Sequence, residues 1–200
     1  ETIVTNSAGD SFHSFDFNRA GDRLYIGTIG GGDRLGKVDL DASYNAIGAA
    51  QPFAQIPGAG AVWLDGIATD VCGNLYVANY IRWSVADERT CYTKPHPEDY
   101  CSPNSYDAPA PDTLYRNLGD GRFEDASFAA GLRAAFGNGL GVVCLDFDGD
   151  GWEDVFVAND GMLNQLWRNR RDGTFEDVGV AAGCAVDQDG RKKAGMGTHA

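Results

Sequence analysis

The amino-acid sequence predicts an all-β fold, and three observations support this prediction. Glycine makes up 27 of the 200 residues, roughly twice its usual share of about 7%. Of the 29 acidic residues 23 are Asp and 6 are Glu, and Asp favours turns, caps and calcium loops over helix interiors. Short aromatic and β-branched runs at 24–27, 75–78 and 155–158 are typical of buried strands, whereas helical periodicity is poor throughout.

Residues 115–125 and 167–177 are two copies of one repeat. Both contain an aromatic residue, Arg-Asn, Asp-Gly and Phe-Glu-Asp at the same spacing, and the offset between them is 52 residues. In each copy the Asp-Gly pair, at 120–121 or 172–173, lies between short apolar-aromatic runs. This arrangement is the strongest local signal for a β-hairpin.

Further similarities lie at larger offsets. Gly195-Met-Gly197 repeats Gly139-Leu-Gly141 at an offset of 56 residues, and residues 60–79 form a weaker third copy upstream. Repeats of about 50–80 residues are typical of β-propeller blades with about four strands each. The sequence therefore predicts roughly three or four propeller blades, which belong to a larger propeller or to an assembly of chains.

Residues 146–154, Asp-Phe-Asp-Gly-Asp-Gly-Trp-Glu-Asp, predict a calcium-binding hairpin loop. Ca²⁺ takes about six to eight oxygen ligands, which alternate Asp side chains on a curled loop can supply. A helix–loop–helix calcium site would need Glu at position 12, where this chain has Val157, and the flanking residues are strand-like. Without a cation, the four carboxylates would repel one another. The predicted ligands are Asp146, Asp148, Asp150, Trp152 through its carbonyl, and Asp154.

The five cysteines are too few for a disulfide scaffold, and no Cys-x-x-Cys pair occurs. Cys91 and Cys101 lie close together in a segment rich in Pro, His and Tyr, where a disulfide would close an irregular loop in an oxidising compartment. Cys72, Cys144 and Cys184 leave an odd thiol. Cys144 lies in an apolar run and is expected to be a small buried side chain.

Charge and hydropathy narrow the choice of partners. The net charge of −13 argues against nucleic acid and anionic membrane surfaces, and favours cations. No apolar run approaches the length of about 18 residues that a membrane-spanning helix needs. We therefore expect neither nucleic-acid binding nor a membrane span.

The acidic loop and the strand that follows it, Val-Phe-Val-Ala-Asn-Asp at 155–160, resemble the FG-GAP/VCBS repeat of integrin-type β-propellers. More narrowly, residues 101–117 and 194–197 resemble the cartilage acidic protein-like (ASPIC/UnbV) repeat proteins of bacteria, a similarity that covers about residues 76–200. The resemblance implies an extracellular or periplasmic propeller stabilised by Ca²⁺, with the five loop ligands named above. The role of such proteins is adhesive or unassigned.

Residues 12–78 resemble a different style of blade, that of the gluconolactonase/senescence-marker-protein propellers. The similar segments are 15–27 and 64–78. In that family the Asp of an Asp-Gly-Ile segment binds the catalytic divalent metal, which corresponds to Asp65 here, but the partner motif is broken at His13-Ser14. Asp65 is therefore either a second metal ligand or, as we expect, a turn residue that opens a strand.

These patterns predict three parts: gluconolactonase-like blades at 1–90, a cysteine-bounded insertion at 91–112, and FG-GAP/VCBS-type blades at 113–200. The leading hypothesis is a secreted, non-enzymatic calcium-binding propeller module with a structural, adhesive or recognition role. Its partner would be a protein, a carbohydrate or other copies of itself. The alternatives are a metal-dependent lactonase or esterase-like hydrolase that uses Asp65, and a subunit of a larger extracellular assembly.

Overall fold

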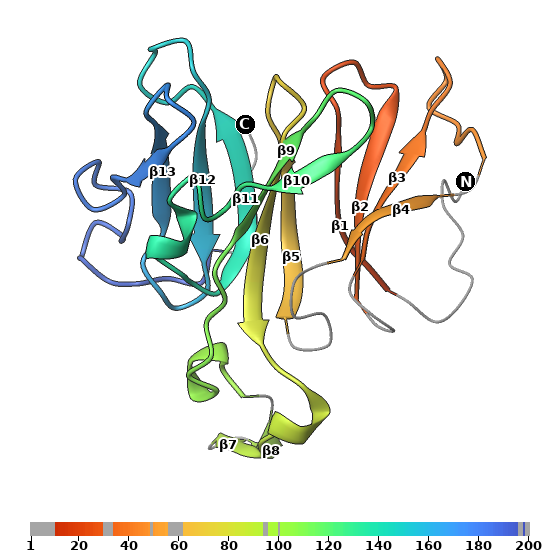
Figure 1. Ribbon diagram of the computed structural model, residues 1–200. Helices are drawn as coiled ribbons and strands as arrows, with labels where there is room; N and C mark the ends of the chain where they lie inside the picture. Colours follow the sequence, from red (N-terminus) through yellow and green to blue (C-terminus); the bar gives the residue numbers. More distant parts are fainter. Residues whose placement is uncertain are drawn as a thin grey trace.

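The computed structural model describes residues 11–29, 34–48, 50–55, 62–93, 96–99, 101–195 and 198. In these ranges the chain forms three four-stranded antiparallel sheets and one two-stranded ribbon, with short 3-10 turns. The three larger sheets lie side by side, as neighbouring propeller blades do (Figure 1). The all-β prediction is confirmed, while closure of the blades into a ring stays a prediction.

The first sheet is a meander of four consecutive strands. Its order is β1 (Ser11–Phe17), β2 (Arg23–Ile29), β3 (Arg34–Asp39) and β4 (Gln51–Gln55). The turn between β1 and β2 is fixed by Asn18, whose side chain accepts the N–H of Arg23 at 3.0 Å. Asn and Asp close turns in this way because their short side chains bond to nearby backbone groups.

The second sheet is interrupted by an insertion. Its strands are β5 (Val62–Thr69), β6 (Leu75–Arg82), β9 (Thr113–Asn117) and β10 (Phe123–Asp125), with β6 paired to β9. Between β6 and β9 the chain forms η1 (Val85–Asp87), β7 (Cys91–Thr93), β8 (His96–Asp99) and η2 (Pro103–Ser105). This insertion projects from one end of the sheets, at the bottom of Figure 1.

The third sheet is regular. After the short η3 (Leu132–Ala134) come β11 (Gly139–Leu145), β12 (Asp154–Asn159), β13 (Gln165–Asn169) and β14 (Phe175–Asp177), in this order. β13 and β14 repeat β9 and β10 residue for residue at the predicted offset of 52, with the same alternation of buried and exposed positions. The two predicted Asp-Gly hairpins are confirmed.

The predicted third repeat copy was wrong. Residues 60–79 are not a separate blade, because β5 and β6 form the first half of the sheet that β9 and β10 complete. β6 and β12 correspond at an offset of 80 residues, whereas β9 and β13 correspond at 52, and the difference of 28 is the insertion. The insertion hid the continuity of the repeat in the sequence, and the predicted part boundaries at residues 90 and 113 fall within this one sheet.

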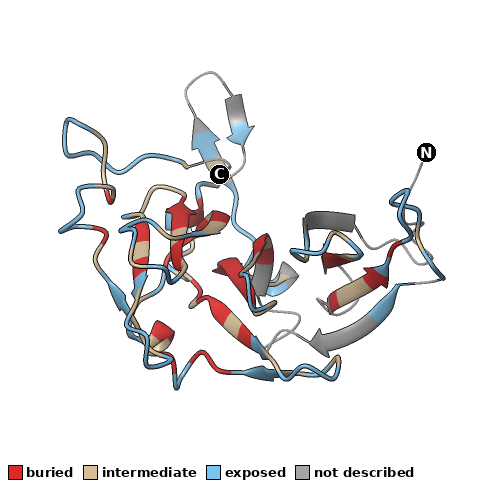
Figure 2. Cartoon of the chain, turned by 90° about the horizontal axis from the view of Figure 1, so that it is seen from above, coloured by how far each residue is buried: buried red, intermediate tan, exposed pale blue. Residues whose placement is uncertain are grey.

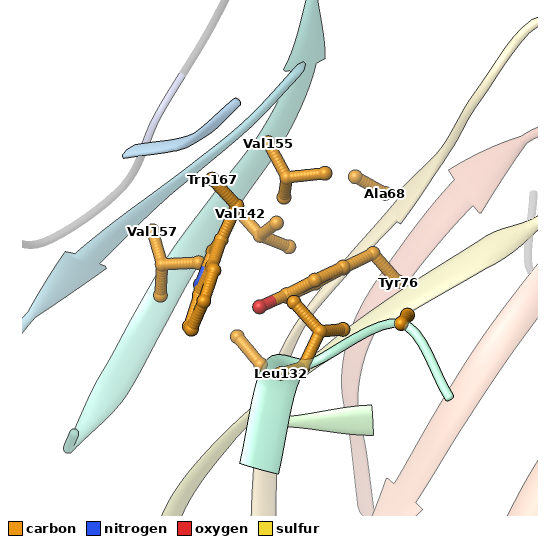
Figure 3. Close-up of a cluster of buried hydrophobic side chains, with 9 residues drawn as sticks. Ala68, Tyr76, Leu132, Val142, Val155, Val157 and Trp167 are labelled. Atoms are coloured by element: carbon orange, nitrogen blue, oxygen red, sulfur yellow. The ribbon is translucent and has the colours of Figure 1, made fainter. Parts of the chain in front are cut away.

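The core lies between the sheets. One cluster joins Tyr25 and Leu35 of the first sheet to Leu75 and Val77 of the second. A second cluster, between the second and third sheets, contains Trp167 with the buried residues shown in Figure 3: Ala68, Tyr76, Leu132, Val142, Val155 and Val157. Figure 2 shows the buried residues gathered on the strands, with exposed residues in the connecting loops. Each sheet is therefore stabilised by its neighbour.

The cysteines behave largely as the sequence predicted. Cys91 and Cys101 form a disulfide within the insertion, with their Cα atoms 5.1 Å apart. Cys72 is exposed and free, while Cys144 and Cys184 are free and partly buried. Cys144 packs against the cluster around Trp167, and burial raises the pKa of its thiol well above the usual value, so the thiol stays protonated.

Candidate cation site

The acidic loop, residues 146–153, joins β11 to β12 at the end of the third sheet. Asp146 shapes this loop: its carboxylate accepts the backbone N–H groups of Gly149 at 2.8 Å, Asp150 at 3.0 Å and Gly151 at 2.9 Å. Gly149 and Gly151 have φ angles of 75° and 88°, which glycine adopts without strain. The loop thus curls around the first carboxylate of the motif.

Three of the predicted ligands converge. Carboxylate oxygens of Asp146, Asp148 and Asp154 all lie within 4.8 Å of one another. Oxygens bound to one Ca²⁺ at about 2.3–2.6 Å can be at most about 5 Å apart, and hard oxygen donors are the ligands Ca²⁺ prefers. The spacing and chemistry of these three carboxylates therefore fit a calcium ion.

Asp154 is the most buried of the three, with 2% of its surface exposed. It accepts the N–H of Asn169 at 2.8 Å and that of Phe147 at 3.2 Å, which fixes the carboxylate between β13 and the loop. Burial raises the pKa of Asp154, and the negative charges of Asp148 and Asp150 add to this effect. A buried carboxylate surrounded by like charges gains most from a cation.

Asp150 is held apart from the other three. Its Oδ2 atom accepts the Nη2 and Nε groups of Arg171 at 2.6 and 2.9 Å, and its Oδ1 atom accepts the N–H of Trp152 at 2.9 Å. The guanidinium lowers the pKa of the Asp150 carboxyl. Sequence analysis missed Arg171, which lies 21 residues beyond Asp150. The ligand roles of Asp150 and of the Trp152 carbonyl stay predictions.

Comparison with protein-family models covers this loop directly. Residues 146–191 match the FG-GAP-like repeat. The match begins at Asp146 and includes the acidic loop together with β12, β13 and β14. A comparison with curated proteins found no match. The FG-GAP part of the resemblance is thus supported, while the ASPIC/UnbV and gluconolactonase resemblances stay predictions.

Outside the FG-GAP-like repeat, the second sheet shows what the same position looks like without an acidic loop. Its β5–β6 turn is the shorter 70–74, closed by Asp70, whose Oδ1 atom accepts the N–H of Asn74 at 2.8 Å. Asn74 takes the place of Asp154: it accepts the N–H of Asn117 at 3.0 Å, as Asp154 accepts that of Asn169. A neutral amide thus replaces the buried carboxylate.

Asp65 does not lie in a turn, so that expectation was wrong. It lies within β5, between Leu64 and Gly66, where the pairing with β6 is irregular, and Asp70 occupies the turn instead. The negative charge of Asp65 contributes to raising the pKa of nearby Tyr80. In the described part of the chain, the grouping of acidic residues suited to a metal is that of Asp146, Asp148 and Asp154, and it does not include Asp65.

A second feature, a cavity of about 590 Å³, lies beside the loop where β1, β5 and β11 meet. Its lining combines aromatic and acidic side chains, among them Phe15, Asp16, Asp70 and Glu153. Glu153 of the acidic loop accepts the N–H of Val71 in the second sheet at 2.7 Å. This hydrogen bond, also missed from the sequence, connects the FG-GAP-like repeat to the neighbouring sheet.

Proposed function

We propose that the protein is a calcium-binding module of β-propeller type, with a structural or recognition role outside the cytoplasm. The observation that carries this proposal is the convergence of Asp146, Asp148 and Asp154 inside an FG-GAP-like repeat. A cation there would offset the repulsion among these carboxylates and hold together β11 and β12, whose ends supply the loop. Binding would therefore stabilise the fold rather than drive a reaction.

Two further features support export and recognition. The Cys91–Cys101 disulfide is of the kind that persists in oxidising compartments. None of the helices in the described ranges is long and apolar enough to cross a membrane. The cavity of about 590 Å³ beside the loop offers aromatic and polar groups to a protein or carbohydrate ligand.

Calcium-dependent stability tests the proposal. At a hundredfold excess over Kd, an ion that binds only the folded state adds about 2.7 kcal/mol to the free energy of unfolding. For a chain of this size that corresponds to a rise in Tm of roughly 5–10 °C. We expect thermal melts with Ca²⁺ to exceed those in EDTA by this amount, and Asp148→Ala to abolish the difference.

The matched control is Asp172→Ala. Asp172 belongs to the same repeat and is exposed, but it caps the β13–β14 turn through Thr174 and lies outside the carboxylate grouping. This variant is expected to keep the full response to Ca²⁺. Identical melts of the unmodified protein in Ca²⁺ and EDTA would rule out a stabilising calcium site.

A further inference from the structure

The side chain of Arg171 acts as a counter-cation for the acidic loop. Its guanidinium makes both contacts with a single oxygen, Oδ2 of Asp150, at 2.6 and 2.9 Å. The charges of Asp148 and Asp146 also contribute to raising the pKa of Arg171, so the guanidinium lies within the electrostatic field of the whole loop. The positive charge offsets part of the repulsion that a metal ion would otherwise relieve.

The backbone at Arg171 is unusual for an arginine. Its φ angle is 65°, in the left-handed region, and the N–H of Arg171 donates to the Asn169 side chain at 2.9 Å. Gly119, 52 residues earlier, makes the same bond to Asn117 at 2.9 Å with a φ angle of 85°. The preceding copy therefore has glycine at this turn, as the conformation favours, and the FG-GAP-like copy has an arginine despite the cost.

This substitution coincides with the acidic loop. In the second sheet the turn that faces Gly119 is the short 70–74 turn. In the third sheet the acidic loop extends to the β13–β14 hairpin, and the side chain of Arg171 reaches it. A long cationic side chain is thus present in the copy that has carboxylates to meet it.

We infer that Arg171 competes with the divalent cation for Asp150 and thereby weakens the cation affinity of the loop. The inference rests on the proposed function. In the cation-free protein Arg171 holds Asp150 away from Asp146, Asp148 and Asp154. When a cation binds, Asp150 turns from the guanidinium to the ion, and the Arg171 side chain, already 54% exposed, moves into solvent.

Calcium titration of charge variants tests the competition. Arg171→Gln keeps the length of the side chain and the demand on the backbone but removes the charge. Because a unit charge next to a divalent ion is removed and Asp150 is released, we expect calcium affinity to rise about tenfold at low ionic strength. Arg171→Lys keeps the charge and is expected to stay near the unmodified affinity.

Arg170→Gln is the matched control. It removes the same charge from the adjacent position of the same hairpin, whereas the contact with Asp150 is made by Arg171. We expect less than about a twofold change, because salt and solvent screen an exposed charge at this distance. As a second readout, Arg171→Gln should lower Tm in EDTA and widen the gap between the melts in Ca²⁺ and EDTA.

The outcomes separate this inference from the proposed function. Calcium binding by the unmodified protein, with equal or weaker binding by Arg171→Gln, would overturn the competition and leave the calcium module standing. Weaker binding would mean that Arg171 instead orients Asp150 for the ion. Absence of binding in both proteins above roughly 1 mM, the weak end of protein calcium sites, would sink both ideas. Binding by Arg171→Gln alone would support the competition.

Discussion

At the scale of single residues, Asp112 is a carboxyl group buried in the second sheet. It is 3% exposed and accepts the N–H of Asn79 at 2.9 Å and the hydroxyl of Tyr76 at 3.0 Å. Burial raises its pKa to about 7, against which these two hydrogen bonds and the charge of Arg133 act only in part. The equivalent residue in the third sheet is Asn164, which accepts the N–H of Asn159 at 3.0 Å. The fold therefore accepts an amide at this position.

Asp112→Asn is predicted to remove a pH-dependent loss of stability. Between pH about 4 and 7 the folded protein keeps a proton on Asp112 that the unfolded chain releases, so the stability of the unmodified protein falls as pH rises through this window. The slope is at most about 1.4 kcal/mol per pH unit. We expect the variant to gain stability over the unmodified protein across this range in urea unfolding, and to keep the gain above pH 7.

The exposed control Asp41→Asn should show the opposite sign. Hydrogen bonds from Asn45 and Ser43 lower the pKa of Asp41, so its contribution is present at neutral pH and disappears as pH falls below about 4. A stability difference between Asp112→Asn and the unmodified protein that does not vary with pH would contradict a buried, protonatable Asp112.

At the scale of elements, the insertion between β6 and β9 is fastened at several points. The Cys91–Cys101 disulfide closes β7 and β8 onto η2, and Arg89 donates to the carbonyl of Ser105 at 2.6 Å. The Asn104 side chain accepts the Nδ2 group of Asn138, next to β11, at 3.2 Å. The insertion is thus an ordered projection in contact with the chain that enters the third sheet.

Removal of the disulfide is predicted to loosen the insertion without unfolding the sheets. Bridging so short a loop stabilises by somewhat under about 3 kcal/mol. In Cys91→Ser/Cys101→Ser we expect a modest fall in Tm and new proteolytic cleavage confined to residues 83–112. Cys72→Ser, which removes an exposed free thiol, should change neither. Free thiols at both positions in protein from an oxidising compartment would contradict the bridge and weaken the proposal of export.

At the scale of the whole molecule, the two outer faces of the row of sheets expose apolar side chains. Phe15 on the first sheet is 66% exposed, and Leu145 on the third sheet is 44% exposed. Gly195 lies against Ala158 of β12, where an added Cβ would come within 2.7 Å, just as Gly139 lies against Ala78 of β6 at 3.0 Å. The chain at residue 195 therefore approaches the third sheet in the way that β11 approaches the second.

These exposed faces predict association. We expect the 200-residue chain to form dimers or larger species at low micromolar concentration, because exposed apolar faces of this kind become buried in an interface. Light scattering should show that Phe15→Ser or Leu145→Ser reduces the measured mass, whereas Phe128→Ser, which removes an 87% exposed side chain near neither outer face, does not. A stable monomer for the unmodified chain would contradict this prediction.

The sequence by itself determined the strand content, the hairpins and the acidic loop, because these depend on local chemistry: Asp-Gly turns, β-branched runs and alternate carboxylates. It also identified Cys91 and Cys101, which lie only 10 residues apart. Tertiary structure decided what depends on contacts distant in sequence. It joined β5–β6 to β9–β10 across a 28-residue insertion, placed Asp65 in a strand, and brought Arg171 to Asp150. Such contacts leave no local pattern, because strand pairing and an ion pair between two hairpins are made only when the sheet assembles.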